Sequence, residues 1–346
     1  MVMGGEVEQQ ICRVEIADGV GYVHLPEFLT VMEAVAFKQA FQSCCQQHPN
    51  LKKTVVDFAG TRFIDSSGIG ALVNVWKVAK SYQLEFCLSN VASQVMMALS
   101  LAGLDSLFEI QSLESASTIT KPSSDDEARR TRGNPMVTHP SVVSRTKRMI
   151  DIVGALIGLG VTGILFIPIA IAITIDDPGP IFFGQTRCSY MGQKFRIWKF
   201  RSMVADAEKL KAKLMAKGEN QYGNGKIFKT KDDPRITRVG NFLRKTSLDE
   251  FPQFWNVLKG EMSLVGTRPP TPNEVEEYDI PEWQRLDVKP GITGEWQVNG
   301  RSSIESFEEI IKLDLAYQEK WSLWYDLQII AKTVLVLFDR NKSGAA

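Results

Sequence analysis

The sequence predicts an α/β protein of two domains, with a membrane-associated helix at the start of the second. Strand-like and helix-like segments alternate through residues 1–120, which is typical of a small α/β domain. A polar stretch rich in Pro, Ser and charge follows and reads as a flexible linker over 121–144. The run 152–175 then contains 24 residues without a charge. We therefore expect a first domain at 1–120 and a second at 145–346.

The first domain is expected to alternate strands and helices. Period-2 patterns predict strands at 19–26, 54–60 and 85–90. Apolar residues at helical spacing predict helices at 30–45, 66–83 and 91–103, the last of them closed by Gly103. This alternation favours one sheet covered by helices.

The most informative motif of this domain is FIDSSGIGALV, at residues 63–73. A strand ending at Asp65 is followed by two serines that can cap a helix. Together with SLAGLDSLFEI (100–110), this motif resembles the STAS family of anti-sigma factor antagonists and sulfate-transporter tails. The resemblance implies a STAS-like fold, a regulatory protein partner, and phosphorylation at Ser66. A helix N-terminus would favour that phosphate and Asp65 would oppose it, so a passive docking module remains an alternative.

Composition limits the chemistry that the chain can use. Its five cysteines lack metal-ligand spacing, which favours reduced thiols in the cytosol. The last of its three histidines is His139, so a catalyst in the second domain must rely on carboxylates, hydroxyls, Lys or Arg. The acidic opening MVMGGEVEQQ has no apolar core, and we expect the N-terminus to stay in the cytoplasm. Basic residues exceed acidic ones after residue 120, which is compatible with anionic partners.

The apolar run 152–175 is long enough to cross a bilayer, for which about 20 residues suffice. Arg145, Lys147 and Arg148 precede it and would remain cytoplasmic. Pro168 interrupts the run and favours a bend. The pattern by itself leaves open whether the segment crosses the membrane or enters and returns.

The adjacent carboxylates Asp249 and Glu250 also have two readings. Ser247 with Glu250 fits a capping box, but Pro252 would then clash at the fifth helical position. A helix starting with Asp249 as N-cap tolerates Pro252 and places both carboxylates at a helix N-terminus. There an ionised carboxylate could bind Mg²⁺ or attack a phosphorus atom.

From about residue 147 to 337 the chain resembles the bacterial sugar transferases, the monotopic polyprenyl-phosphate phosphoglycosyl transferases. The resemblance is carried by DPGPIFF (177–183), KFRSM (199–203), DPRITRVGNFLRKTSLDEFPQFWNVLKGEMSLVGTRP (233–269), KPGITGEWQVNGR (289–301) and WSLWYDL (321–327). It implies an α/β transferase domain with a re-entrant hydrophobic helix. The implied reaction moves a sugar 1-phosphate from a UDP-sugar to polyprenyl (undecaprenyl) phosphate and releases UMP.

The resemblance also implies roles for individual residues. Asp249 would form a covalent phosphosugar intermediate, and Glu250 would hold Mg²⁺ against the diphosphate. The positions implied to contact phosphate or nucleotide are Lys199, Arg201, Arg244, Arg268 and Arg301.

Because UDP-sugars are cytoplasmic, we expect a re-entrant helix bent at Pro168. Two positions depart from the family pattern: Ile167 stands where the family has Ser, and Thr267 stands where it commonly has Pro. We expect a monotopic protein of the inner (cytoplasmic) membrane, in contact with membrane lipids and with both soluble domains in the cytoplasm. No nucleic-acid partner is expected. The product would start an exopolysaccharide, capsule, lipopolysaccharide or O-antigen-type glycan. The alternative function is a membrane-tethered STAS signalling scaffold with an inactive transferase domain.

Overall fold

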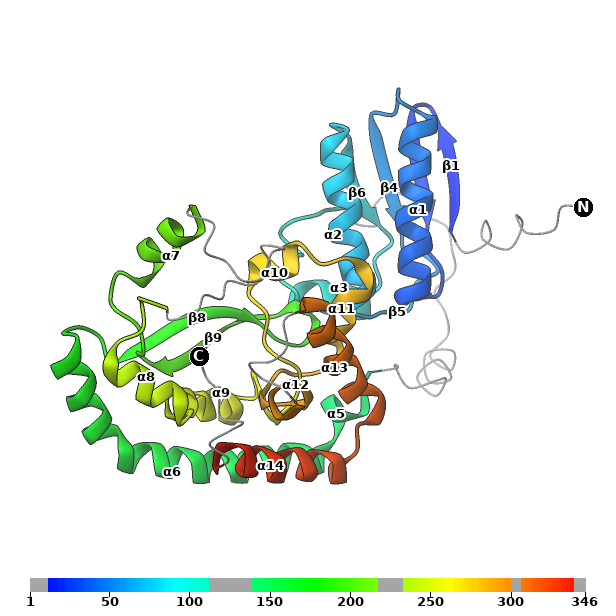
Figure 1. Ribbon diagram of the computed structural model, residues 1–346. Coiled ribbons are helices and arrows are strands. Elements are labelled where there is room, and N and C mark those ends of the chain that lie inside the picture. Colours follow the sequence, from blue (N-terminus) through cyan, green and yellow to red (C-terminus); the bar gives the residue numbers. More distant parts are fainter. Residues whose placement is uncertain (1–11, 112–137, 217–232, 300–305, 339–346) are drawn as a thin grey trace, which may run out of the picture. The chain divides into compact units, whose positions relative to one another are not determined.

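The computed structural model describes residues 12–111, 138–216, 233–299 and 306–338, which divide into two compact units. The first unit comprises the chain up to Thr138 and two short segments from further along, Met191–Gln193 and Tyr278–Asp287. The second unit comprises the remainder from His139. Figure 1 shows the helices and strands of both units.

The first unit contains a five-stranded sheet in the order β1-β2-β4-β6-β7. Strands β2, β4, β6 and β7 run parallel, and β1 pairs antiparallel with β2. The short strands β3 and β5 form a separate parallel pair. The strands are β1 Arg13–Ala17, β2 Val20–His24, β3 Phe28–Leu29, β4 Lys53–Asp57, β5 Phe63–Ile64, β6 Glu85–Ser89 and β7 Glu109–Gln111.

Three longer helices of this unit occupy the places that the sequence predicted, and the α/β fold class is confirmed. They are α1 Val31–Gln47, α2 Ser66–Ser81 and α3 Ser93–Leu101. Asp65 caps α2, since its carboxylate accepts a hydrogen bond of 2.8 Å from the Gly68 amide. Gly103 follows α3 with a φ of +69°, as expected of a residue that ends a helix. Strand β1 was missed because it is mostly exposed and shows no buried alternation.

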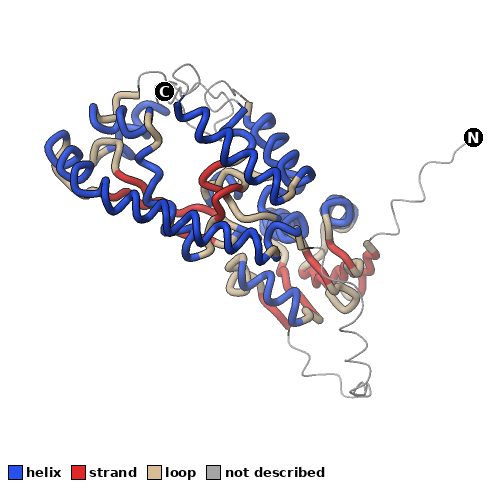
Figure 2. Tube along the Cα trace, turned by 90° about the horizontal axis from the view of Figure 1, so that it is seen from below, coloured by secondary structure: helices blue, strands red, loops and turns tan. Residues whose placement is uncertain are grey.

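The second unit is mainly helical, with an antiparallel strand pair, β8 Phe182–Cys188 and β9 Lys194–Phe200, among its helices (Figures 1 and 2). A short parallel pair joins β10 Ser263–Val265 to β11 Gly291–Thr293. The helices are α5 Pro140–Val143, α6 Arg145–Asp176, α7 Ala207–Ala216, α8 Arg238–Lys245, α9 Phe254–Lys259, α10 Pro272–Glu276, α12 Glu295–Asn299, α13 Phe307–Lys320 and α14 Leu323–Phe338, with a 3₁₀ helix η3 at Leu248–Gln253. The remaining short helices, η2 Tyr190–Gly192, α11 Ile280–Trp283 and η4 Gln284–Asp287, lie wholly or largely in the two segments of the first unit.

Helix α6 is the one helix in the described part of the chain that is long and apolar enough to cross a membrane. It spans 32 residues and continues through Pro168. In its most apolar stretch of 18 residues, 17% is buried within the protein. One face packs on small clusters of this unit through Ala155, Ile169 and Ile173. The exposed apolar residues recur at helical spacing and are Met149, Val153, Leu156, Ile157, Val161, Ile164, Ile167, Ile171 and Ile175. An exposed apolar stripe of this length is unfavourable in water and fits a lipid environment.

Candidate active site

The carboxylate pair lies on the turn that connects α8 to α9. Residues 248–253 form the 3₁₀ helix η3, and Ser247 before it adopts a left-handed conformation with a φ of +55°. The Ser247 side chain makes no capping hydrogen bond, and Asp249 is the second residue of the turn. Both capping hypotheses drawn from the sequence are therefore wrong. Pro252 has no N–H to donate and would clash in a regular α-helix, so regular α-helix begins only at Phe254.

Asp249 and Glu250 differ in their surroundings. Asp249 is buried, with 6% of its surface exposed, whereas Glu250 is half-buried. The Lys199 Nζ atom donates a hydrogen bond of 2.8 Å to Glu250 Oε1. Lys199 lies near the end of β9, which packs against η3. The structure thus brings Lys199 into contact with Glu250, which lies 51 residues later in the chain and directly follows Asp249.

Asn256 lies in α9, directly after the turn that carries the carboxylate pair, and its side chain is hydrogen-bonded to β9. Its side chain is fully buried, and its Nδ2 atom donates to the Arg196 carbonyl and to Glu261 Oε2, each at 2.7 Å. The Trp198 amide donates to Asn256 Oδ1 at 3.3 Å. A buried amide with partners on both ends fixes the position of the chain around it, because leaving any of these groups unpaired costs about 1–3 kcal/mol. No local pattern in the sequence indicates this role.

Helix α6 is packed closely on the same turn. A Cβ atom placed on Gly158 would lie 2.4 Å from the Phe254 ring, so glycine is needed for the approach of α6 to α9. Arg148 donates from its two terminal nitrogens to the Val257 and Leu258 carbonyls, each at 2.6 Å. These are carbonyls of the last turn of α9, where a cation is favourable. Arg148, expected as a membrane flank, therefore also anchors the helix that carries on from the carboxylate pair.

Lys147 is the centre of a buried polar network at the start of α6. Its Nζ atom lies 2.6 Å from Asp326 Oδ2 on α14 and donates to the Val265 carbonyl at 3.0 Å. Asp326 Oδ1 accepts a 2.8 Å hydrogen bond from Tyr317, whose hydroxyl pKa is raised by burial and by the Asp326 charge. The network ties α6 to α13, α14 and β10. Sequence reasoning missed it because the partners lie far from Lys147 along the chain.

Arg268 forms an ion pair with the carboxylate of Glu274. Its two terminal nitrogens bond to Glu274 Oε2 and Oε1 at 2.9 and 3.2 Å, the bidentate geometry typical of Arg–carboxylate pairs. Burial opposes ionisation of Glu274, but the charge and hydrogen bonds of Arg268 outweigh it and lower the pKa of that carboxyl. Arg268 is thus a guanidinium already oriented by protein contacts.

The other predicted phosphate ligands have different surroundings. Arg201 is buried and pairs with Asp177, whose Oδ2 atom lies 3.4 Å from Arg201 Nη1. Arg244 is half-buried in the last turn of α8. Burial opposes ionisation of Asp233, but the hydrogen bonds and charge of Arg235, with a smaller contribution from Arg244, lower the pKa of that carboxyl. Arg301 lies outside the described residues. Substrate contact by these arginines stays a prediction.

The donor set at the pair is suitable for Mg²⁺. In the described ranges, no group of three or more His, Cys, Asp or Glu side chains converges on a metal site. Mg²⁺ is commonly held by one or two carboxylates together with substrate phosphates rather than by an all-protein cage. Asp249 and Glu250 offer hard oxygen donors of that kind, so the residues fit a metal that is shared with a diphosphate.

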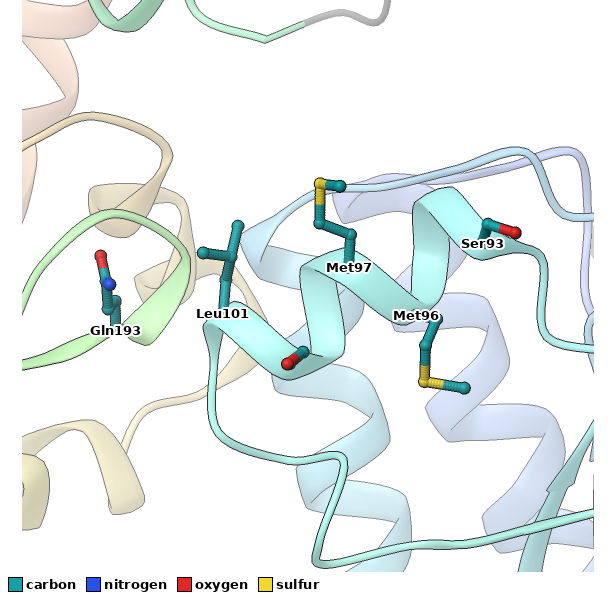
Figure 3. Close-up of a pocket in the computed structure, with 6 residues that line it drawn as sticks. Ser93, Met96, Met97, Leu101 and Gln193 are labelled. Atoms are coloured by element: carbon teal, nitrogen blue, oxygen red, sulfur yellow. The ribbon is translucent and has the colours of Figure 1, made fainter.

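A hollow elsewhere in the protein is not a rival catalytic site. It has a volume of about 440 Å³ and lies in the first unit beside α3 (Figure 3). No titratable side chain lines it; the lining residues are Ser93, Met96, Met97, Ser100, Leu101 and Gln193.

Comparisons with known proteins match two separate parts of the chain. Residues 142–340 match the family model described as bacterial sugar transferase, and residues 12–116 match the STAS domain. The galactosyl transferase CpsE of Streptococcus agalactiae is 52% identical over 191 residues, which are 55% of this chain and 42% of that protein. The UDP-glucose:undecaprenyl-phosphate glucose-1-phosphate transferase of Escherichia coli K12 is 41% identical over 196 residues, 54% of this chain and 39% of that protein. The chain thus spans less than half the length of these relatives.

Among solved structures, a putative anti-sigma factor antagonist of Thermotoga maritima aligns with 22% identity over 36% of this chain and 97% of that one, with a TM-score of 0.27. At that score, the assignment of the N-terminal domain rests on the family match rather than on the alignment.

The chain belongs to the bacterial sugar transferase family, and it carries a STAS domain before the transferase domain. Both resemblances read from the sequence are confirmed.

Proposed function

We propose that this protein transfers a hexose 1-phosphate from a UDP-hexose to polyprenyl phosphate, releases UMP, and so begins the assembly of a membrane-bound glycan. The observation that carries the proposal is the buried Asp249 beside Glu250, with Lys199 at hydrogen-bond distance from Glu250, in a chain of this family. Relatives named for galactose and for glucose transfer both match, so the hexose is left open.

In the first step, a carboxylate oxygen of Asp249 attacks the β-phosphorus of the UDP-sugar. A bond forms between that oxygen and phosphorus, and the bond from phosphorus to the bridging oxygen breaks with UMP as leaving group. An acyl phosphate then joins Asp249 to the sugar phosphate. Burial of Asp249 restricts access of water, which would otherwise hydrolyse this intermediate.

In the second step, a phosphate oxygen of the polyprenyl phosphate attacks the same phosphorus. The bond to Asp249 breaks, the carboxylate is restored, and the sugar becomes linked to the lipid through a diphosphate. Cationic side chains are needed because negative charge gathers on the phosphoryl oxygens in both steps. Lys199 donates to Glu250 of the pair, and Arg268, which is oriented by Glu274, is proposed as a second cation that contacts these oxygens.

Mg²⁺ is proposed as the cofactor, held by Glu250 with Asp249 nearby. When bound, the ion would neutralise charge on the diphosphate and favour departure of UMP. Lys199 occupies one oxygen of Glu250, so binding of the ion would require that contact to be shared or exchanged.

Membrane placement is proposed to be monotopic, with both soluble units on the cytoplasmic side. The support comes from the two ends of α6. Arg148 near its start bonds to α9, and Asp176 at its end accepts a 2.8 Å hydrogen bond from the Val239 amide of α8. A helix bound at both ends to one folded unit does not leave that unit on two sides of a bilayer. A bend at Pro168 on entering lipid remains part of the proposal.

The test is UMP release by the full chain in detergent, with undecaprenyl phosphate, Mg²⁺ and a panel of UDP-sugars. We expect release with one UDP-hexose and loss of that release in Asp249→Asn. Asp206→Asn is the matched control, because its side chain is 73% exposed and pairs with Lys209, an exposed side chain three residues further along the same segment.

Silence across the panel, from folded protein with lipid present, would contradict the proposal and favour the scaffold alternative. Equal release by wild type and Asp249→Asn would contradict the role assigned to this carboxylate.

A further inference from the structure

Ser66, the residue predicted as a phosphorylation site, is sealed by a segment from the C-terminal half of the chain. The Ser66 backbone amide donates a 3.0 Å hydrogen bond to Asp287 Oδ1. The Ser66 hydroxyl lies 3.4 Å from Met191 Sδ, and the residue has no exposed surface. Both partners belong to the first compact unit, although they follow Ser66 by more than 120 residues.

The same segment, residues 278–287, packs along the helices of the STAS domain. Its helix α11 (Ile280–Trp283) contacts α2 and α1. The Trp283 ring lies so close to Gly70 that a Cβ atom at Gly70 would be 2.5 Å from two ring atoms. At the rim, Lys38 on α1 pairs with Asp279 at 3.0 Å. Exposed pairs of this kind contribute little, so the contact depends mainly on the buried Trp283 and the half-buried Asp287.

Charge makes this contact sensitive to a phosphoryl group. Asp287 places a carboxylate at the N-terminus of α2, which is where a helix binds anions. Burial and the neighbouring Asp287 charge raise the pKa of Asp65, so the site already disfavours a second negative charge. A phosphate on Ser66 would add about −1.5 to −2 charge beside both carboxyls. It would also need the space that Met191 and Asp287 fill.

We propose that the partner of the STAS domain is residues 278–287 of the same chain, and that docking of this segment and phosphorylation of Ser66 exclude each other. Docking hides the Ser66 hydroxyl from a kinase. Once modified, Ser66 repels Asp287 and releases the segment. The STAS domain then binds residues 278–287 of its own chain when Ser66 is unmodified and releases them when Ser66 is phosphorylated. This proposal does not depend on the proposed transfer reaction.

The segment is connected to residues of the transferase domain on both sides. Tyr278 follows α10 closely, and α10 holds Glu274 against Arg268. Val288 follows Asp287 directly and belongs to an apolar cluster with Val265 and Tyr317. Release of the segment would therefore free a stretch of chain whose two ends are fixed near Arg268 and the Lys147 network.

Hydrogen–deuterium exchange of the full chain in detergent tests the proposal. Because α11 has four residues and few hydrogen bonds of its own, its amides are protected mainly by docking. In Ser66→Asp we expect exchange in residues 278–287 to accelerate by about tenfold or more, with exchange in β4 unchanged. Ser66→Ala, which adds no charge, should retain the protection of the wild type.

Gly70→Ala is an independent perturbation that adds no charge. The new methyl group would meet the Trp283 ring, while alanine is favourable within α2 itself. We expect the same acceleration in 278–287. Unchanged protection in both Ser66→Asp and Gly70→Ala would overturn the proposal. Equal acceleration in β4 and in the segment would also count against it, because docking would then not be separable from folding of the domain.

Discussion

The buried pair of Lys147 and Asp326 gives a sharp test of how α6 is attached to the transferase domain. Asp326→Asn keeps the shape of the side chain but removes its charge. Lys147 has 6% of its surface exposed, so its ammonium group would stay buried without the carboxylate to which it is hydrogen-bonded. Removing one partner of a buried ion pair costs about 3–5 kcal/mol. For a domain of about 200 residues this lowers the thermal midpoint by about 6–20 °C.

The assay is thermal unfolding of the second unit in detergent, compared among three variants. Lys147→Met combined with Asp326→Asn removes both charges, and it should recover most of the loss, to within about 2 kcal/mol of the wild type. Asp206→Asn removes one partner of an exposed pair and should leave the midpoint unchanged. A single Asp326→Asn variant as stable as wild type, or a double variant no better than the single, would refute the reasoning.

Two further predictions concern the contacts around the two sites. Gly158→Ala should push α6 away from Phe254, cost about 1–3 kcal/mol and reduce UMP release, whereas Gly160→Ala, with no atom within 4 Å of the new methyl, should do neither. Burial, assisted at Asp65 by the charge of Asp287, raises the pKa of Asp65 to about 7 and of Asp287 to about 6. While the segment 278–287 is docked, Asp65 and Asp287 stay protonated at pH values at which they would be ionised after its release. Docking is therefore strongest below about pH 4 and weakens as pH rises through about 7. Asp287→Asn should flatten this dependence of the segment's exchange protection, and a steeper dependence would contradict the assignment.

The elements of the first domain could be predicted because their apolar residues follow clear periods. α1, α2 and α3 come close to the expected ranges, and Gly103 closes the third as expected. The docking of residues 278–287 on α2 could not be predicted, because no local pattern in that segment indicates a partner more than 200 residues earlier.

The carboxylate pair was found from its motif, but its geometry was not. Capping rules offered two helix starts, and the actual 3₁₀ turn follows from Pro252 together with packing on β9. Arg148 and Lys147 were interpreted as membrane flanks from local charge alone. Their carbonyl and carboxylate partners lie 109 and 179 residues further along the chain, so only the folded structure assigns them.

The most direct test of the proposed chemistry is the intact mass of the protein after incubation with its UDP-hexose and Mg²⁺ in the absence of polyprenyl phosphate. We predict an added mass of one phosphosugar, located by peptide analysis on Asp249, absent in Asp249→Asn, and discharged when undecaprenyl phosphate is supplied. Turnover to lipid-linked product without any adduct on Asp249, or with an adduct on another residue, would contradict a covalent mechanism at this carboxylate.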